Sequence, residues 1–134
     1  MSEGNARKRN PSKKKTGVTF ETVRQIALAL PGVEEGTSYR TVTFRAGKRM
    51  LARFHQDGES LVLKVQYAAR EVLTGSMPEV FYVTDHYRCW PYMLVSLKNV
   101  EPELLRSLFE EAWRAVASKR AIAEYEAKIK NLKH

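Results

Sequence analysis

The sequence is poor in cysteine, in long apolar runs and, over its first 18 residues, in acidic side chains. Cys89 is its single cysteine, so no disulfide can form within the chain, and one thiol suits a reducing compartment. No apolar run approaches the ~18 residues of a membrane-spanning helix, and the lysine-rich start lacks the apolar stretch of a secretory signal. These absences argue against a membrane protein or a disulfide-stabilised secreted domain, and they predict a cytoplasmic location.

The scarcity of acidic residues at both ends decides where the net charge of +8 lies. Residues 1–18 have a net charge of +5 and residues 118–134 one of +3, while residues 19–117 are neutral overall. Within that neutral part, residues 39–64 carry +4. Clustered basic charge attracts nucleic acid, so these three segments are the candidate binding regions.

Composition divides the chain of 134 residues into three parts. Residues 1–18 mix Ser, Gly, Asn, Pro and Lys without a hydrophobic period, which is typical of a disordered arm. The cations of this arm are Arg7, Lys8, Arg9, Lys13, Lys14 and Lys15. Residues 19–118 are long enough to bury one core and predict one domain. Residues 119–134 keep a thin apolar stripe and predict a basic helical extension.

Hydrophobic periodicity predicts three helices and five strands in the domain. The predicted helices cover residues 20–30, 67–73 and 102–117. The predicted strands cover residues 40–46, 49–55, 60–66, 80–84 and 92–97, and residues 32–38 are predicted to be a loop. The order α-β-β-β-α-β-β-α therefore predicts a two-layer α+β domain, with a five-stranded antiparallel sheet and helices on one face.

Alternation along the first three predicted strands assigns side chains to the two faces of the sheet. The core face would carry Val42, Phe44, Ala52, Phe54, Leu61, Leu63 and Val65. The opposite face would carry Thr43, Arg45, Arg53, His55 and Lys64, and we expect it to be solvated. Trp113 lies on the apolar stripe of the last predicted helix, so we expect it to be largely buried.

The predicted solvated face is the best candidate for contact with phosphates. Arg45, Arg53 and Lys64 would converge there, with Lys48 and Arg49 in the adjoining turn, and the arm would add sequence-independent affinity. An ordinary solvated sheet face would show the same alternation of polar residues. Phe44 and Phe54 are assigned to the core face, so no aromatic residue is interleaved with these cations on the predicted solvated face. This argues against a protein that stacks the bases of single strands.

Residues 85–91 form the densest group of chemically special side chains. His86 and Cys89 are the pair to consider for nucleophilic catalysis, but Asp85 is adjacent to His86, so their side chains diverge and no group orients the base. We interpret the segment as an aromatic cover over the end of the sheet. Its candidate contacts to a ligand or partner are His86, Tyr87, Arg88 and Trp90.

Other signs of chemistry are missing from the sequence. His55, His86 and Cys89 lack the paired spacing of a zinc site. The glycines mark turns and form no phosphate-binding loop. We therefore expect no catalytic residue, no metal and no cofactor, and a protein that is not an enzyme.

Four stretches, in order, resemble the MmcQ/YjbR-like family over roughly residues 19–120. They are LALPGVEEGTSY at 28–39, DGESLVLKV at 57–65, FYVTDHYRCWPYMLVSL at 81–97 and FEEAWRAVASKR at 109–120. The resemblance implies a fold similar to that of secretion chaperones, and DNA binding through a double-wing motif. It implies no catalytic residue. The segment RTVTFRAGKR after Tyr39 is more basic than the family pattern, and both basic tails look like additions to it.

The sequence thus predicts a non-enzymatic accessory protein that binds DNA, or nucleic acid more broadly, with the basic sheet face and the arm. The alternative is a protein-interaction adaptor, which a neutral domain with a chaperone-like fold would suit. Salt distinguishes the two, because phosphate contacts weaken steeply as salt rises while an apolar groove responds little. A third hypothesis is a small-ligand pocket beneath residues 86–91, which would require a concave site.

Overall fold

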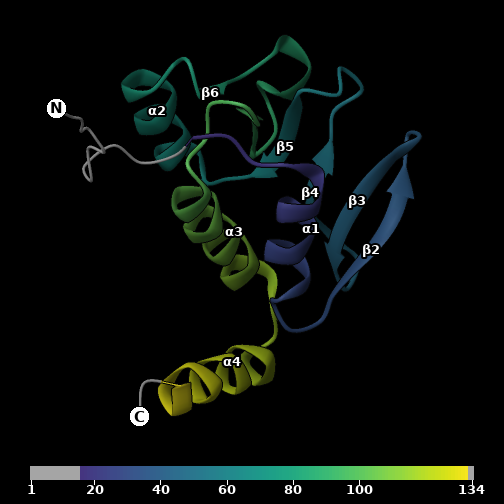
Figure 1. The fold of residues 1–134 in the computed structure, drawn as a ribbon, viewed down its shortest axis with the longest axis vertical. Coiled ribbons are helices and arrows are strands. Elements are labelled where there is room, and N and C mark those ends of the chain that lie inside the picture. Colours follow the sequence, from purple (N-terminus) through teal and green to yellow (C-terminus); the bar gives the residue numbers. More distant parts are fainter. Residues whose placement is uncertain (1–15, 133–134) are drawn as a thin grey trace, which may run out of the picture.

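The computed structural model describes residues 16–132 as a six-stranded antiparallel sheet with helices packed on one face (Figure 1). The strands are β2 (Val33–Ser38), β3 (Thr41–Ala46), β4 (Arg49–Phe54), β5 (Ser60–Lys64), β6 (Phe81–Tyr82) and β7 (Tyr92–Ser96). The helices are α1 (Phe20–Leu28), α2 (Tyr67–Ser76), α3 (Pro102–Val116) and α4 (Lys119–Leu132), with a 3₁₀ turn η1 (Asp85–Tyr87). The strand order is β2-β3-β4-β5-β7-β6.

The predicted number of five strands is wrong, because residues 33–38 form an edge strand rather than a loop. β2 pairs with β3 from Val33 opposite Ala46 to Ser38 opposite Thr41. Its residues 34–37 are exposed on both faces of the sheet, so no apolar alternation marks the strand. Pairing with β3 alone makes this segment a strand, and such pairing between segments leaves little trace in local sequence.

Helices α1 and α3 cover what we call the inner face of the sheet. The Thr19 hydroxyl accepts a hydrogen bond from the Thr22 N–H at 3.1 Å and caps α1. Pro102 begins α3, where its missing N–H is not needed. The Trp113 side chain of α3 is fully buried, and its Nε1–H donates to the Pro31 carbonyl at 2.8 Å. The predicted burial of Trp113 is confirmed.

The predicted core face is also confirmed. Its residues, which join one apolar cluster with α1 and α3, are Val42, Phe44, Ala52, Phe54, Leu61, Leu63 and Val65. Phe44, Leu61 and Leu63 have no solvent exposure at all. Period-two alternation therefore identified this face correctly, because the apolar cover of helices demands apolar side chains along every strand beneath it.

The two ends of the domain differ in how they join it. Gly17 and Val18 donate to the carbonyls of Val100 and Leu97 at 2.7 and 2.8 Å, so the domain includes these two residues of the segment assigned above to the arm. All six arm cations lie outside the described residues. At the far end, the extended backbone of Ala117 separates α4 from α3. Tyr125 of α4 packs on Trp113 with ring centroids 5.1 Å apart and donates to Glu110 at 2.8 Å.

Candidate functional site

The outer face of the sheet, opposite α1 and α3, is not solvated as predicted. Thr43 has no exposure and Arg53 only 5%. The connection between β6 and β7 folds over this face and places Tyr87 against Val62 and Leu94 in a small second apolar cluster. The interpretation of this connection as an aromatic cover is therefore confirmed for Tyr87. The cover comes from a distant part of the chain, which is why alternation within β3 and β4 did not reveal it.

Arg53 is a buried cation held by neutral groups. Its Nη2 donates to the Tyr87 hydroxyl, and its Nη1 donates to the Thr41 hydroxyl at 3.2 Å and to the Phe54 carbonyl at 3.5 Å. Its guanidinium carbon lies 5.4 Å from the centroid of the Tyr39 ring, within the range of a cation–π contact. Among residues 16–132, no carboxylate lies within ion-pair distance of Arg53. Its buried positive charge is thus solvated by neutral groups of the protein, and no carboxylate of the described residues neutralises it.

Arg53 lines a pocket of about 440 Å³ on the outer face, which we call the Arg53 pocket. Its walls are formed by Tyr39, Met50, Arg53, His55, Gln56, Thr84, His86, Tyr87, Trp90 and Tyr92. None of these residues is acidic. The rings of Trp90 and Tyr39 are largely open to solvent, with exposed fractions of 60% and 76%. The volume falls in the range of ~300–1,000 Å³ that is usual for small-ligand sites.

Arg45 and Lys64 lie near Tyr92 but do not line the Arg53 pocket themselves. The Lys64 ammonium is 5.7 Å from the Tyr92 ring centroid. Burial raises the pKa of the Tyr92 hydroxyl, with the positive charge of Arg45 opposing and Tyr87 reinforcing the shift. Tyr92 is therefore a neutral O–H group at physiological pH. In the sheet register, Glu34 stands opposite Arg45.

Arg70 of α2 organises the loop that forms one wall of the pocket. Its guanidinium donates to four loop carbonyls, at 2.8 to 3.2 Å, and these belong to Tyr87, Arg88, Trp90 and Tyr92. The Tyr67 hydroxyl donates to the Cys89 carbonyl at 2.9 Å. Backbone carbonyls held in this way fix the path of the loop, so Trp90 is presented from a rigid support. Sequence analysis missed Arg70, because an arginine on a short amphipathic helix looks like a solvated side chain.

The remaining predicted site residues divide between the exposed surface and the Arg53 pocket. Lys48 and Arg49 are exposed at the turn between β3 and β4, and neither lines the Arg53 pocket. Arg88 is exposed and pairs with Asp85 at 2.7 Å. His86 and Trp90 line the pocket with Tyr87, as the small-ligand hypothesis required.

The face that carries the cations does not lack aromatic rings, contrary to the prediction. Tyr39 comes from the turn between β2 and β3, and Trp90 and Tyr92 come from the β6–β7 connection and the start of β7. Folding brings all three rings to the pocket that Arg53 lines. The argument against base stacking considered only the strands that carry the cations, and its premise is therefore wrong.

The part of the chain that the structure describes contains neither a cluster of metal-binding side chains nor a membrane-spanning helix. No three His, Cys, Asp or Glu side chains gather there as metal ligands would. Between residues 16 and 132, no helix has the length and apolar character needed to cross a bilayer.

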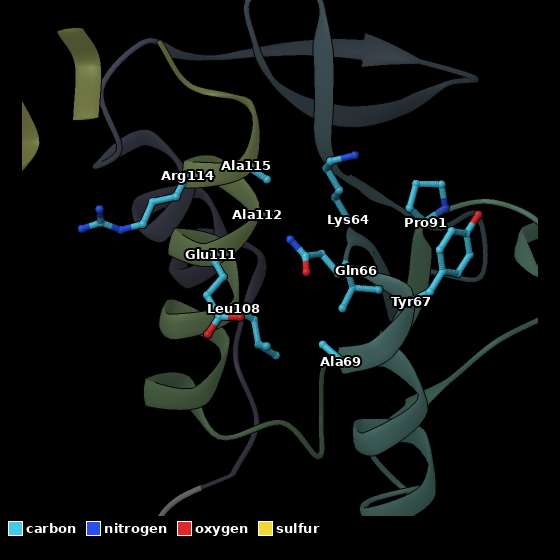
Figure 2. A pocket seen from close by; sticks show the side chains of 11 residues that line it. Lys64, Gln66, Tyr67, Ala69, Pro91, Leu108, Glu111, Ala112, Arg114 and Ala115 are labelled. Atoms are coloured by element: carbon cyan, nitrogen blue, oxygen red, sulfur yellow. The ribbon is translucent and has the colours of Figure 1, made fainter. Parts of the chain in front are cut away.

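A second hollow, of about 580 Å³, lies between α3 and the segment that joins β5 to α2 (Figure 2). Leu108 and Ala112 of α3 lie on one side of it, and Gln66 and Ala69 on the other. Arg114 points away from the hollow (Figure 2) and bonds Glu110 and Glu126 at 3.0 and 2.7 Å. We call this hollow the α2–α3 groove.

Comparisons with known proteins match the part of the chain that contains both hollows. The model of the YjbR family matches residues 28–115. The crystal structure of Deinococcus radiodurans protein DR2400, with domain DUF419, is 27% identical, with a TM-score of 0.63. The match covers 75% of this chain and 80% of that chain. No curated protein matches the chain. The family match includes every residue of the Arg53 pocket and leaves out α4.

Proposed function

We propose that this chain, which belongs to the YjbR family, binds single-stranded nucleic acid with the outer face of its sheet and catalyses no reaction. The observation that carries the proposal is the pair of solvent-exposed rings, Trp90 and Tyr39, beside a pocket with a buried arginine and no acidic wall. DNA binding is what the family resemblance implies. The exposed rings favour unpaired nucleotides as the ligand over an intact duplex.

Stacking explains this preference for single strands. A base in a duplex is covered on both faces by its neighbours, whereas an unpaired base can lie flat on an exposed ring. Base–aromatic stacking contributes roughly 1–3 kcal/mol per base and tolerates any sequence. Trp90 is held for this role by the Arg70 hydrogen bonds to the loop.

Electrostatic attraction would come from cations around the pocket. Arg45 and Lys64 flank Tyr92, and Lys48 and Arg49 extend the positive charge to the β3–β4 turn. These residues would meet phosphates and release counterions. The cations of residues 7–15 would add to this attraction without reading sequence.

The proposal is tested with the full chain, by fluorescence anisotropy of a labelled random single strand and of the matching duplex at two salt concentrations. We expect the single strand to bind more tightly, and Trp90→Ala to weaken its binding by about 1–3 kcal/mol. Replacing Lys48 and Arg49 by Gln should make the affinity less sensitive to salt. The slope of the logarithm of the binding constant against the logarithm of salt concentration should become shallower by up to ~0.7 for each phosphate that these cations no longer neutralise.

The matched control is Val72→Ala, which removes an exposed apolar side chain of α2 that does not line the pocket. It should leave the affinity unchanged. Equal binding of strand and duplex, or a Trp90→Ala protein that binds as the parent does, would show that stacking is not the basis of binding.

The α2–α3 groove supports a second candidate function, that of a protein-interaction adaptor. Its walls include the apolar side chains of Val65, Ala69, Leu108 and Ala112, which would accept apolar side chains of a partner segment. If the chain binds no nucleic acid in either salt condition, this candidate takes precedence. Substituting Ala115→Gln, at an exposed position of α3 that lines the groove, should then weaken partner binding without a change in salt dependence.

A further inference from the structure

The uncompensated charge of Arg53 is the feature that the proposed function leaves unexplained. A solvated cation at the surface would serve electrostatic attraction equally well and would need no burial. Burying a charged side chain costs free energy unless charge or hydrogen bonds replace its water. Part of that water is replaced by the hydroxyls of Tyr87 and Thr41, the Phe54 carbonyl and the Tyr39 ring, and no described carboxylate completes the set. The arrangement is that of an anion site whose negative partner comes from a ligand.

The backbone near the pocket supports this interpretation. Tyr39 and Arg40 form a two-residue turn in which both residues have positive φ, 53° and 68°. Such turns strongly favour Asn-Gly or Asp-Gly, since other side chains are strained there. Strained backbone conformations of this kind concentrate at ligand sites. Here the strained turn places the Tyr39 ring against the Arg53 guanidinium.

The chemistry of the pocket narrows the ligand class. Besides Arg53, the walls offer hydrogen-bonding groups from His55, Gln56, Thr84 and His86, which suits an anion with several acceptor oxygens. The Trp90 ring, 60% exposed on another wall, suits a planar ring system. The volume of about 440 Å³ lies low in the range for small-ligand sites and fits a single compact unit. A phosphate joined to a planar base meets all three conditions.

We infer that the Arg53 pocket binds one nucleotide that is not stacked on other nucleotides, with its phosphate on the Arg53 guanidinium and its base on the Trp90 ring. This inference rests on the proposed function, for which it names the unit that the site recognises. A free mononucleotide and a nucleotide within a strand carry the same chemistry. Arg53 then binds the phosphate directly. General electrostatic attraction comes from the cations named above, which are Arg45, Lys48, Arg49 and Lys64.

The two tryptophans of the chain provide a direct assay on the full-length protein. Trp90 is exposed in the pocket, whereas Trp113 is fully buried beneath the inner face. A nucleoside monophosphate that stacks on Trp90 should quench the exposed part of the emission and leave the Trp113 part unchanged. The matching nucleoside, which lacks phosphate, should bind about 10- to 100-fold more weakly, because it forms no charge-assisted hydrogen bond. Inorganic phosphate alone should compete for the site without quenching.

Arg53→Met is the decisive variant. It should abolish the advantage of the monophosphate over the nucleoside, while its melting temperature stays level or rises, because a buried charge without a carboxylate partner is removed. Arg53→Lys keeps the charge but loses the planar fork, so we expect intermediate affinity. Trp90→Phe should still bind the monophosphate in calorimetry, without quenching. If Arg53→Met does not fold, the parent protein still tests the inference. The monophosphate should raise the melting temperature of the parent more than the nucleoside does, and equal shifts would overturn the inference.

The outcomes separate the inference from the proposed function. A monophosphate that binds while single strands do not would support the inference and overturn the proposed function. Single strands that bind equally well to the parent and to folded Arg53→Met would overturn the inference and leave the proposed function standing. Equal binding of monophosphate and nucleoside would also overturn it. A melting temperature that falls steeply in Arg53→Met, with monophosphate preference intact, would assign Arg53 to structure alone.

Discussion

The inner and outer faces of the same sheet are covered by different kinds of structure. Two helices with continuous apolar stripes cover the inner face, and the side chains beneath them are almost all apolar. One loop covers part of the outer face, and its Tyr87 packs on Val62 and Leu94 beside the charged Arg53. The inner face is therefore built for stability. The outer face is less completely buried and combines apolar packing with groups that can bind a ligand.

The largest expected effect comes from damage to the inner face. Phe44 is fully buried and meets the Phe54 ring edge-on, with centroids 6.1 Å apart. Phe44→Ala should lower the free energy of unfolding by about 3–5 kcal/mol, through reduced burial and the cavity left behind. Denaturant unfolding measures this decrease. Nucleic-acid affinity of the folded fraction should not change, and a marked change there would mean that the two faces are coupled.

A smaller effect, confined to the outer face, is expected for Arg70→Met. The substitution keeps the aliphatic stem but removes the donors to the carbonyls of the loop at 87–92. The free energy of unfolding should fall by about 1–3 kcal/mol. Hydrogen exchange of residues 87–92 should accelerate, and affinity for single strands should fall with it.

Arg106→Met, on the exposed surface of α3, is the matched control for Arg70→Met. It removes the same charge without touching the loop. It should change neither the hydrogen exchange of residues 87–92 nor the free energy of unfolding. Unchanged exchange in Arg70→Met would refute the role of Arg70 as the support of the loop.

The smallest expected effect runs in the opposite direction. Arg40→Gly relieves the positive φ of 68° at the β2–β3 turn. Because glycine also gains freedom in the unfolded chain, we expect a net stabilisation of no more than about 1 kcal/mol. Tyr39→Asn should stabilise similarly but remove the ring beside Arg53, so affinity should fall only in that variant. Thermal unfolding and single-strand binding of the two variants measure these effects. A loss of stability in both variants would contradict the idea that positive φ strains this turn.

The inner face was predictable in detail and the outer face was not. Phe44, Leu61 and Leu63 follow the period of two, and helical spacing marked the partners that cover them. β2 was missed because its residues 34–37 are exposed on both sides and carry no apolar period. Arg53 was assigned by the same alternation as Phe44 and Ala52, so its side of the sheet was predicted correctly while its burial was not.

The pocket depends on contacts that lie far apart in sequence. Arg53 and Tyr87 are 34 residues apart, and Arg70 and Tyr92 are 22 apart. The loop at 85–91 was identified as chemically dense from its residue types alone. Its position over β4 and β5, and the Arg70 contacts that hold it there, are not encoded in any local pattern.

The sequence by itself determined the family, the α+β class, the inner core and the basic ends. These properties follow from composition and from short-range periods, which each segment expresses wherever it lies. Tertiary structure alone decided that Arg53 is buried without a described carboxylate, and that Tyr39 and Trp90 stand beside it. The physical reason is that a cation's environment depends on which distant groups exclude water from it, and the folded arrangement of the chain sets those neighbours.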